Sequence, residues 1–165
     1  MAAMVIRPAR SDDFAAIAAI TNHYIATTAI HFAYEPIEPE ELVAKWRTQE
    51  YPWLVVEDGG ELAGYAKSGA WRDRAAYKWT CEVGLYIADG ARGRGLGSAL
   101  YAALLDAVAR RGFRSAIAGI TLPNDVSVAL HARLGFASVG VVRDAGFKLG
   151  GWHDVEFFQK QFASG

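Results

Sequence analysis

The stretch of sequence best suited to chemistry runs from Thr80 to Ser98, where an acidic residue precedes a glycine-rich turn. Arg92, Gly95 and Gly97 have the spacing R-x-x-G-x-G. Glycines let the backbone approach a phosphate closely, and a helix beginning here offers N–H groups and a partial positive charge. The turn therefore predicts a site for a phosphorylated ligand, although a tight strand-to-helix turn without any ligand would also favour glycine.

This turn differs from two familiar phosphate-binding loops. A Walker A loop ends in Gly-Lys-Ser/Thr, and that ending is missing here. The glycines at positions 93, 95 and 97 also lack the spacing of the dinucleotide fingerprint G-x-G-x-x-G. The ligand must therefore be inferred from the elements around the turn.

Glu82 is the acidic residue on the strand that leads into this turn. Alternation along a strand places Thr80, Glu82 and Tyr86 on one face, with Cys81 and Val83 on the other. A partly buried carboxylate has a raised pKa and can accept a proton near neutral pH. A solvated or ion-paired strand glutamate is the alternative. Because Cys81 points away from Glu82, we interpret it as a small buried residue and not as a nucleophile.

Hydrophobic spacing and turn residues predict the elements that must position these groups. The expected helices are a first one capped by Ser11, a second over 39–49, a third over 97–111 and a fourth over 125–134. The expected strands cover 4–9, 52–58, 61–70, 77–89, 115–121 and two segments around the glycines at 150 and 151. The order β-α-α-β-β-β-α-β-α-β-β predicts a mixed α/β sheet in one domain over 1–165.

Composition narrows the classes of function. A chain of 165 residues fits one domain, and 17 Lys plus Arg against 18 Asp plus Glu give no reason to expect a nucleic-acid or membrane partner. One cysteine excludes an internal disulfide and fits a reducing compartment. The sequence shows neither a signal-peptide pattern nor a membrane-length apolar run, so we expect a cytoplasmic protein. His23, His31 and His153 lack metal-ligand spacing, which predicts no metal site.

Several motifs together resemble the GCN5-related N-acetyltransferase (GNAT) superfamily, in particular its phosphinothricin and methionine sulfoximine N-acetyltransferase branch. The motifs are "YPWLVVE", "YKWTCE", "GLGSALY", "LPNDVSVALHARLGF" and "GGWHDVEFFQ". The resemblance extends from about Ile6 to Phe162. It implies a GNAT fold with a mixed central sheet of about seven strands flanked by about four helices, acetyl-CoA as co-substrate without a metal, and a homodimer.

The same resemblance implies where acetyl-CoA binds. Strands of this family splay from the next strand past the acidic residue, and the exposed main chain contacts the thioester and pantetheine. The turn surrounds the pyrophosphate, and polar residues near the last helix complete the site. The implied cofactor residues are Leu85, Tyr86, Ile87, Arg92, Gly93, Arg94, Gly95, Leu96, Gly97, Ser98, Asn124 and Ser127.

Two residues are implied to be catalytic. By resemblance, Glu82 is the general base that takes the proton of the amine, directly or through a water molecule. His131 stands where many GNAT enzymes carry a tyrosine that can protonate the leaving thiolate, and spacing places it on one helix face with Asn124 and Ser127. His131 could be the acid, a cofactor contact, or a core histidine whose nitrogens have protein partners.

The acceptor is expected to contact the loop "WRDRAA" and the strand after it. Arg72 and Arg74 could hold a carboxylate with paired hydrogen bonds. The resemblance implies the same loop, Arg72, Asp73 and Arg74, together with Glu82, Val83 and Gly84. Phe32 and Glu35 are candidates for the opposite wall, although exposed loop positions without a ligand are an equal interpretation.

We therefore predict an acetyltransferase that moves acetyl from acetyl-CoA to the α-amino group of a small amino-acid-like substrate. Phosphinothricin, methionine sulfoximine and methionine sulfone are the expected types. A protein N-terminus or a polyamine is the alternative acceptor, and a non-catalytic acyl-CoA sensor is the alternative class. Fold alone does not fix the acceptor in this superfamily.

Overall fold

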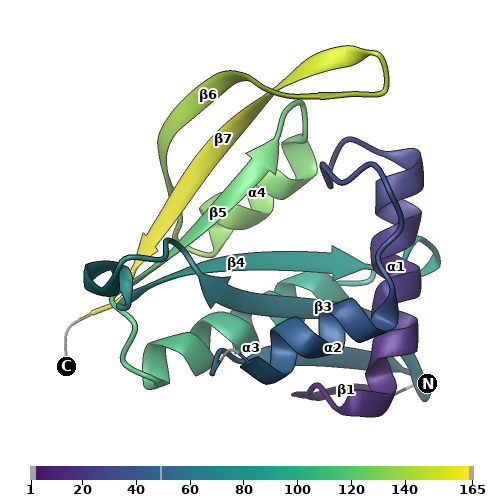
Figure 1. The fold of residues 1–165 in the computed structure, drawn as a ribbon. Helices are drawn as coiled ribbons and strands as arrows, with labels where there is room; N and C mark the ends of the chain where they lie inside the picture. The colour runs from purple at the N-terminus through teal and green to yellow at the C-terminus, as the bar shows by residue number, and fades with distance from the viewer. Residues whose placement is uncertain (1–2, 49, 164–165) are drawn as a thin grey trace.

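The structure, a computed structural model, describes residues 3–48 and 50–163. In this part of the chain seven strands form one sheet in the order β1-β2-β3-β4-β5-β7-β6 (Figure 1). Only β4 and β5 pair in parallel, so the expected mixed sheet is confirmed. The strands are β1 Met4–Pro8, β2 Trp53–Asp58, β3 Glu61–Ala70, β4 Thr80–Ile87, β5 Ser115–Thr121, β6 Ala137–Lys148 and β7 Gly151–Gln161.

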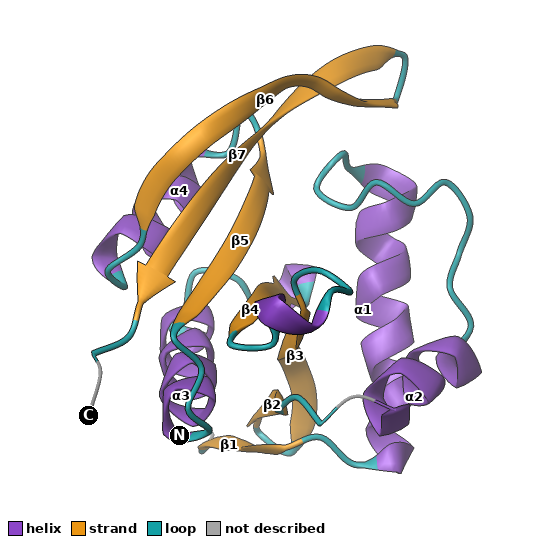
Figure 2. Cartoon of the chain, turned by 60° about the vertical axis from the view of Figure 1, so that its left-hand side comes forward, coloured by secondary structure: helices purple, strands orange, loops and turns teal. Residues whose placement is uncertain are grey.

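The helices cover both faces of this sheet. They are α1 Phe14–Thr27, α2 Pro39–Thr48, α3 Leu96–Arg110 and α4 Asp125–Arg133. Figure 2 shows α1 and α2 on one side of the sheet and α3 and α4 on the other, and each pair packs over its own hydrophobic core. Within the described residues, no helix has the length and apolar character needed to cross a membrane.

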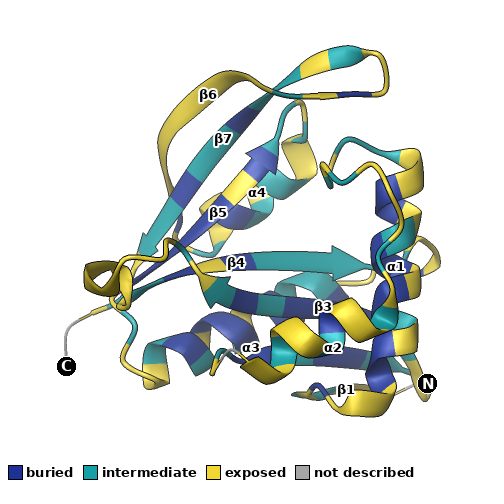
Figure 3. Ribbon diagram, viewed as in Figure 1, coloured by how far each residue is buried: buried dark blue, intermediate teal, exposed yellow. Residues whose placement is uncertain are grey.

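Side-chain alternation along β4 follows the prediction. Cys81 and Val83 are buried in the core beneath α3, while Tyr86 packs toward the core beneath α1. Glu82 shares the face of Tyr86 but is exposed, on a strand whose other residues are buried or intermediate (Figure 3). The carboxylate therefore faces the α1 and α2 side, where the sheet is incompletely covered.

The strand before the glycine turn is shorter than predicted. It begins at Thr80 and not at Tyr77, because Ala75–Tyr77 forms one turn of 3-10 helix. In that turn the Tyr77 N–H donates to the carbonyl oxygen of Arg74 at 3.0 Å. The aromatic residues at 77 and 79 suggested a strand, but this local hydrogen bond turns the chain first.

The first helix also begins later than predicted. Ser11 lies in a 3-10 turn, Ser11–Asp13, and α1 begins at Phe14. Among the described residues, no side chain caps α1. The carboxylate of Asp13 instead caps the 3-10 turn, since it accepts the Arg10 N–H at 2.7 Å, and it also accepts two N–H groups of Arg7 at 2.8 and 2.9 Å. The hydrogen bonds from Arg7 hold the pKa of Asp13 below its usual range, so this carboxylate stays ionised and ties β1 to α1.

The parallel pair β4 and β5 separates soon after it forms. Their register comprises Thr80 with Ser115, Cys81 with Ala116 and Glu82 with Ile117, and then the strands diverge (Figure 1). Beyond Glu82 the main chain of β4 pairs with β3 alone. This splay is the feature that the resemblance implied, and it leaves peptide groups available to a ligand.

The long β6–β7 ribbon rests on the loop that joins α1 to α2. The Lys148 ammonium donates to the carbonyl oxygens of Ile25 and His31, at 2.7 and 2.6 Å. The ring of Phe32 packs so closely on Gly146 that a Cβ there would clash with the ring. These contacts fix the loop beside the open face of β4.

Candidate active site

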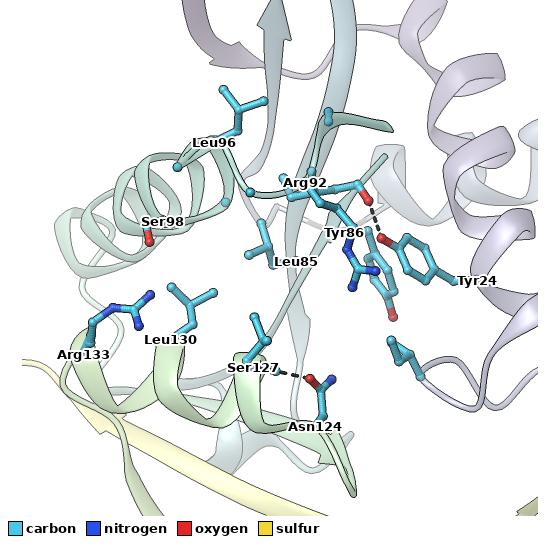
Figure 4. Close-up of a pocket in the computed structure, with 17 residues that line it drawn as sticks. Tyr24, Leu85, Tyr86, Arg92, Leu96, Ser98, Asn124, Ser127, Leu130 and Arg133 are labelled. Carbon is cyan, nitrogen blue, oxygen red and sulfur yellow. Dashed lines mark hydrogen bonds between the residues drawn. The ribbon is translucent and has the colours of Figure 1, made fainter. Parts of the chain in front are cut away.

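A cavity of about 280 Å³ lies between β4, the start of α3 and α4, and we call it the turn cavity (Figure 4). Its wall includes the glycine-rich turn and the part of β4 that has left β5. The lining residues are Tyr24, Ile30, 85–87, 91–93, 95–98, Asn124, Val126, Ser127, Leu130 and Arg133.

The glycine-rich turn presents main chain to this cavity. Gly93 and Gly95 have φ angles of 78° and 76°, in the left-handed region that favours glycine. Gly95 is the N-cap of α3, and no side chain caps the helix. The first-turn N–H groups of a helix have no intrahelical acceptor, so they can bind an anion here. Arg92, whose guanidinium lies 5.7 Å from the ring centre of Tyr24, adds positive charge.

All the predicted cofactor residues line the turn cavity except Arg94. The Arg94 guanidinium pairs instead with the carboxylate of Asp58, and it donates to the carbonyl oxygen of Gly90 at 3.1 Å. Arg94 therefore holds the turn against β2. The position of Arg94 in the motif suggested a contact with the ligand. In the structure the carboxylate of Asp58 pairs with its charge instead.

Sequence reasoning missed Tyr24 and Arg133 as lining residues. The Tyr24 hydroxyl donates to the carbonyl oxygen of Ile87, so α1 holds the end of β4 (Figure 4). Tyr24 fitted the apolar stripe of the first helix, and nothing in the sequence indicated this contact. Arg133 follows His131 on α4 and adds a second guanidinium to the cavity wall. Together with Arg92 it gives the cavity a positive character.

The start of α4 is built by Asn124. Its side-chain oxygen accepts the Ser127 N–H at 3.2 Å, as in a standard N-cap (Figure 4). Both residues line the turn cavity, as predicted. The cap leaves the amide nitrogen of Asn124 available for a ligand.

His131 is buried, with both ring nitrogens near protein partners. Nδ1 lies 2.7 Å from the carbonyl oxygen of Ser127, and Nε2 lies 3.0 Å from the Tyr101 hydroxyl. A carbonyl can only accept, so we assign the proton to Nδ1 and make Nε2 the acceptor from Tyr101. Burial lowers the pKa of His131, which keeps the ring neutral. Both ring nitrogens thus have protein partners, but His131 also lines a small cavity of about 90 Å³ where β4 leaves β5, so its catalytic role stays a prediction.

A second and larger cavity, of about 700 Å³, opens on the other face of β4, and we call it the Glu82 cavity. Its lining residues are 30–32, Lys45, Trp53, 67–70, Asp73, 82–84, Tyr86, Gly119, Thr121, Val142, Ala145, Val155 and Phe157. Ile30 and Tyr86 line both cavities. A small cavity of about 90 Å³ in the splay shares residues with each, so the two meet where β4 leaves β5.

Glu82 is suited to accept a proton in this position. Its direct cross-strand neighbour on β3 is Gly69, so the residue opposite Glu82 on that strand has no side chain. Loss of water around the carboxyl group raises the pKa of Glu82, while the positive charges of Lys67 and Arg72 oppose that rise. A carboxyl group with a raised pKa is a better base near neutral pH than an ordinary one.

Only some of the residues predicted to bind the acceptor line the Glu82 cavity. Phe32, Asp73, Val83 and Gly84 line the Glu82 cavity with Glu82, as expected. Glu35 does not line it and is exposed.

The two arginines of the predicted acceptor loop are absent from the cavity wall. Arg72 and Arg74 are exposed, and the Arg72 guanidinium stacks 4.4 Å from the ring centre of Trp71. The cations that line the cavity are Lys45 and Lys67, neither of which sequence reasoning selected.

The remaining predicted absences concern a metal and a cysteine nucleophile. Across residues 3–48 and 50–163, no group of three or more His, Cys, Asp and Glu side chains could hold a metal ion. Cys81 faces the core opposite Glu82, and burial raises the pKa of its thiol to about 12. A thiol that stays protonated is a poor nucleophile.

Two named enzymes resemble the whole chain. A phosphinothricin N-acetyltransferase of Streptomyces viridochromogenes is 48% identical over 159 residues, covering 95% of this chain and 87% of that protein. An L-methionine sulfoximine/L-methionine sulfone acetyltransferase of Salmonella typhimurium is 35% identical over 161 residues, covering 96% and 94%.

Family and fold comparisons agree with these relatives. The acetyltransferase (GNAT) family model matches residues 17–136. The solved structure of a GNAT superfamily phosphinothricin acetyltransferase from Sinorhizobium meliloti in complex with acetyl-CoA has a TM-score of 0.93 and 32% identity, covering 97% of this chain and 89% of that chain. The uncapped helix and left-handed glycines of the turn cavity fit the phosphates of acetyl-CoA. The chain therefore belongs to the acetyltransferase (GNAT) family and is an acetyl-CoA-dependent N-acetyltransferase.

Proposed function

We propose that this enzyme acetylates the α-amino group of a small amino-acid-like acceptor of the phosphinothricin, methionine sulfoximine or methionine sulfone type. The observation that carries the proposal is the position of Glu82, a carboxyl group of raised pKa in the wall of a large cavity where β4 leaves β5. The two curated relatives described above carry these acceptors in their names.

Glu82 acts as the general base. An amine attacks only in its neutral form and loses a proton as the new N–C bond forms. The carboxylate takes that proton, directly or through a water molecule. When bound, acetyl-CoA would supply the activated acetyl thioester; its C–S bond breaks as the amide is completed, and the sulfur of the departing CoA takes a proton from water. Main-chain N–H groups on the edge of β4 that β5 has left donate to the developing oxyanion.

The residues of the turn cavity hold the co-substrate. Main-chain N–H groups at 93–98 bind the pyrophosphate, and Arg92 adds a charge-assisted contact. Asn124 and Ser127 bind the pantetheine arm from α4. In this arrangement the thioester lies in the splay, between the two cavities.

Turnover of a set of candidate acceptors tests this proposal directly. Release of CoA is measured with phosphinothricin, methionine sulfoximine, methionine sulfone and spermidine. We expect turnover with at least one of the amino acids and none with spermidine. Turnover with spermidine alone would contradict the acceptor class. Tight acetyl-CoA binding without turnover of any acceptor would contradict the proposed reaction and favour a sensor.

We further propose a cytoplasmic homodimer. Exposed apolar side chains on β6, on its turn to β7 and at the start of β7 support self-association, since a second copy would cover them. They are Val139, Val141, Val142, Phe147, Leu149 and Trp152. Light scattering after size exclusion should give twice the chain mass of 17.9 kDa. A single-chain mass at micromolar concentration would contradict the dimer.

A further inference from the structure

Lys67 is a cation in the Glu82 cavity that the proposed mechanism does not use. On the sheet it lies between Trp53 of β2 and Gly84 of β4, its direct cross-strand neighbours. A Cβ added to Gly84 would lie 3.9 Å from Cε of Lys67, so the lysine side chain runs over this glycine. The ammonium lies 5.6 Å from the ring centre of Trp53. The side chain is therefore held against the cavity wall.

No described protein group forms a hydrogen bond or an ion pair with the ammonium of Lys67, and the charge of Glu82 acts on it only from a distance. Lys148, in contrast, donates to two carbonyl oxygens. Loss of water lowers the pKa of Lys67, and the charge of Lys45 adds to this, while Glu82 opposes it. A desolvated cation without a counter-charge is unfavourable, so an anionic ligand would stabilise it.

Trp53 provides a second unsatisfied donor beside the same cavity. Within the described part of the chain, its Nε1 is the buried side-chain N or O atom that lacks a hydrogen-bond partner. Trp53 is 5% exposed and lines the Glu82 cavity next to Lys67. Buried donors are normally paired, so this N–H also favours an acceptor atom supplied from outside the protein.

The sheet register relates Lys67 to the proposed base. Lys67 and Gly69 share a face of β3, and Glu82 lies opposite Gly69. Lys67 and Glu82 are therefore diagonal neighbours on adjacent strands, a relation that separates side-chain origins by roughly 7 Å. Because glycine is the direct neighbour of each on the other strand, no Cβ stands directly opposite either Lys67 or Glu82 on that neighbouring strand.

The cavity is also polarised. Lys67 and Lys45 line the side of β3 and α2, whereas Asp73 lines the side of the β3–β4 loop. When the amine of an acceptor lies at Glu82, a negatively charged group of the same acceptor is most stable near Lys67. The α-carboxylate is attached to the same carbon as the amine, whereas the side chain can extend over the separation between Glu82 and Lys67.

We propose that Lys67 binds an acidic group at the end of the acceptor side chain, so that the enzyme prefers amino acids with an anionic side chain over those with a neutral one. This inference rests on the proposed function. It makes Lys67 a specificity-determining residue, with the Trp53 N–H as a second donor to the same group. Phosphinothricin carries such an anion, its phosphinate. Methionine sulfone carries the same α-carboxylate but a neutral side chain.

The test compares these two acceptors in Lys67→Met. We expect kcat/KM for phosphinothricin to fall about 10- to 100-fold, the usual range for losing a charged hydrogen bond, and kcat/KM for methionine sulfone to change less than about threefold. Lys67→Arg keeps the charge and should keep the preference, which separates loss of charge from loss of fold. Trp53→Phe keeps an aromatic ring but removes the N–H, and should lower kcat/KM for phosphinothricin alone.

Lys78→Met is the matched control. It removes the same charge from an exposed lysine whose ammonium lies 5.0 Å from the ring centre of Trp79, and which does not line the cavity. Both acceptors should keep their wild-type kcat/KM in this variant. An equal fall for both acceptors in Lys67→Met, or no change for either, would overturn the inference.

A binding measurement distinguishes failure of this inference from failure of the proposed function. If the wild type turned over neither acceptor, the proposed function would fail. Calorimetry of phosphinothricin with the CoA-loaded enzyme would still test Lys67. Tighter binding of phosphinothricin than of methionine sulfone, lost in Lys67→Met, would support the inference. Equal or absent binding of both would overturn it.

Discussion

The two cavities that meet at β4 are built in different ways. The turn cavity is formed largely by one continuous unit, the end of β4, the glycine-rich turn and the start of α3, and the turn presents its main chain. The Glu82 cavity is formed by side chains from α2, from four strands near the middle of the sheet, from the β6–β7 ribbon and from the α1–α2 loop. Co-substrate recognition therefore depends on local backbone shape, whereas acceptor recognition depends on long-range packing.

The charged residues that line the two cavities also differ. Arg92 and Arg133 line the turn cavity, together with the positive end of α3, and its lining includes no acidic residue. The Glu82 cavity mixes Glu82 and Asp73 with lysines. The first pattern suits a polyanion, and the second suits an acceptor that carries both an amine and an acid. Single substitutions should therefore affect one ligand and spare the other.

The largest expected effect is that of Glu82→Gln. Removing the proposed base should lower kcat with phosphinothricin by about 10²- to 10⁴-fold, the usual contribution of general base catalysis. The dissociation constant of acetyl-CoA should stay within about twofold, because Glu82 lines the other cavity. Steady-state kinetics and calorimetry measure the two quantities.

Glu61→Gln is the control for that change, since Glu61 is an exposed residue at the start of β3. It should leave both quantities at their wild-type values. A Glu82→Gln enzyme that lost acetyl-CoA affinity as strongly as turnover would show that the cavities are not independent.

Gly95→Ala should weaken acetyl-CoA specifically. The φ of 76° at Gly95 disfavours any residue with a Cβ by about 1–2 kcal/mol, so the turn should shift or lose stability. We expect the KM for acetyl-CoA to rise about 10-fold and the KM for the acceptor to stay unchanged. Gly90→Ala, in the same loop, serves as the control because a Cβ there meets nothing within 4 Å and its φ is not in the left-handed region. A higher acceptor KM with normal acetyl-CoA KM would contradict the assignment of the turn.

Lys148→Met should weaken binding of the acceptor and not of acetyl-CoA. The variant removes one hydrogen bond to Ile25, near the end of α1, and one to His31 in the α1–α2 loop, and so it loosens the wall that carries His31 and Phe32. We expect a loss of about 1–3 kcal/mol in the free energy of unfolding and a rise of about threefold in acceptor KM. Chemical denaturation and steady-state kinetics test this, with Lys78→Met as the exposed-lysine control. An effect on acetyl-CoA KM alone would contradict it.

The smallest expected effect on activity is that of Cys81→Ala. The thiol is buried under α3 on the face opposite Glu82, and its raised pKa keeps it protonated. Activity should stay within about twofold of the wild type, while the free energy of unfolding falls by about 1 kcal/mol because a small cavity forms. Loss of turnover without loss of stability would instead indicate an acetyl-cysteine intermediate.

The different construction of the cavities also explains what the sequence could predict. The predicted cofactor residues between 85 and 98 are consecutive, so one strand-turn-helix motif places them together. Arg94 was the exception, because a charge in a loop does not reveal whether a ligand or a carboxylate such as Asp58 will pair with it. Fold class and element order followed from hydrophobic spacing, while the 3-10 turns at element ends did not.

The lining of the Glu82 cavity could not be predicted from residue spacing along the chain, because it depends on which residues of neighbouring strands lie opposite one another. Alternation along β3 places Lys67 on a face with Tyr65, but only the register with β4 sets glycines opposite both Lys67 and Glu82. The β2–β3 pairing also contains a bulge between Val56 and Glu57, which residue spacing does not predict. Arg72 was selected for its chemistry, but contact with the adjacent Trp71 ring keeps it outside the cavity.

The pH dependence of kcat, measured with phosphinothricin for the wild type and for Glu82→Gln, tests the central claim that Glu82 accepts the amine proton. Below its pKa the carboxyl group is protonated and cannot act as a base, so wild-type kcat should fall as the pH drops through that pKa. Desolvation places this fall above the ordinary range for a carboxyl group. We predict that the acid limb is absent from the residual activity of Glu82→Gln. The same limb at the same pH in that variant would contradict the account.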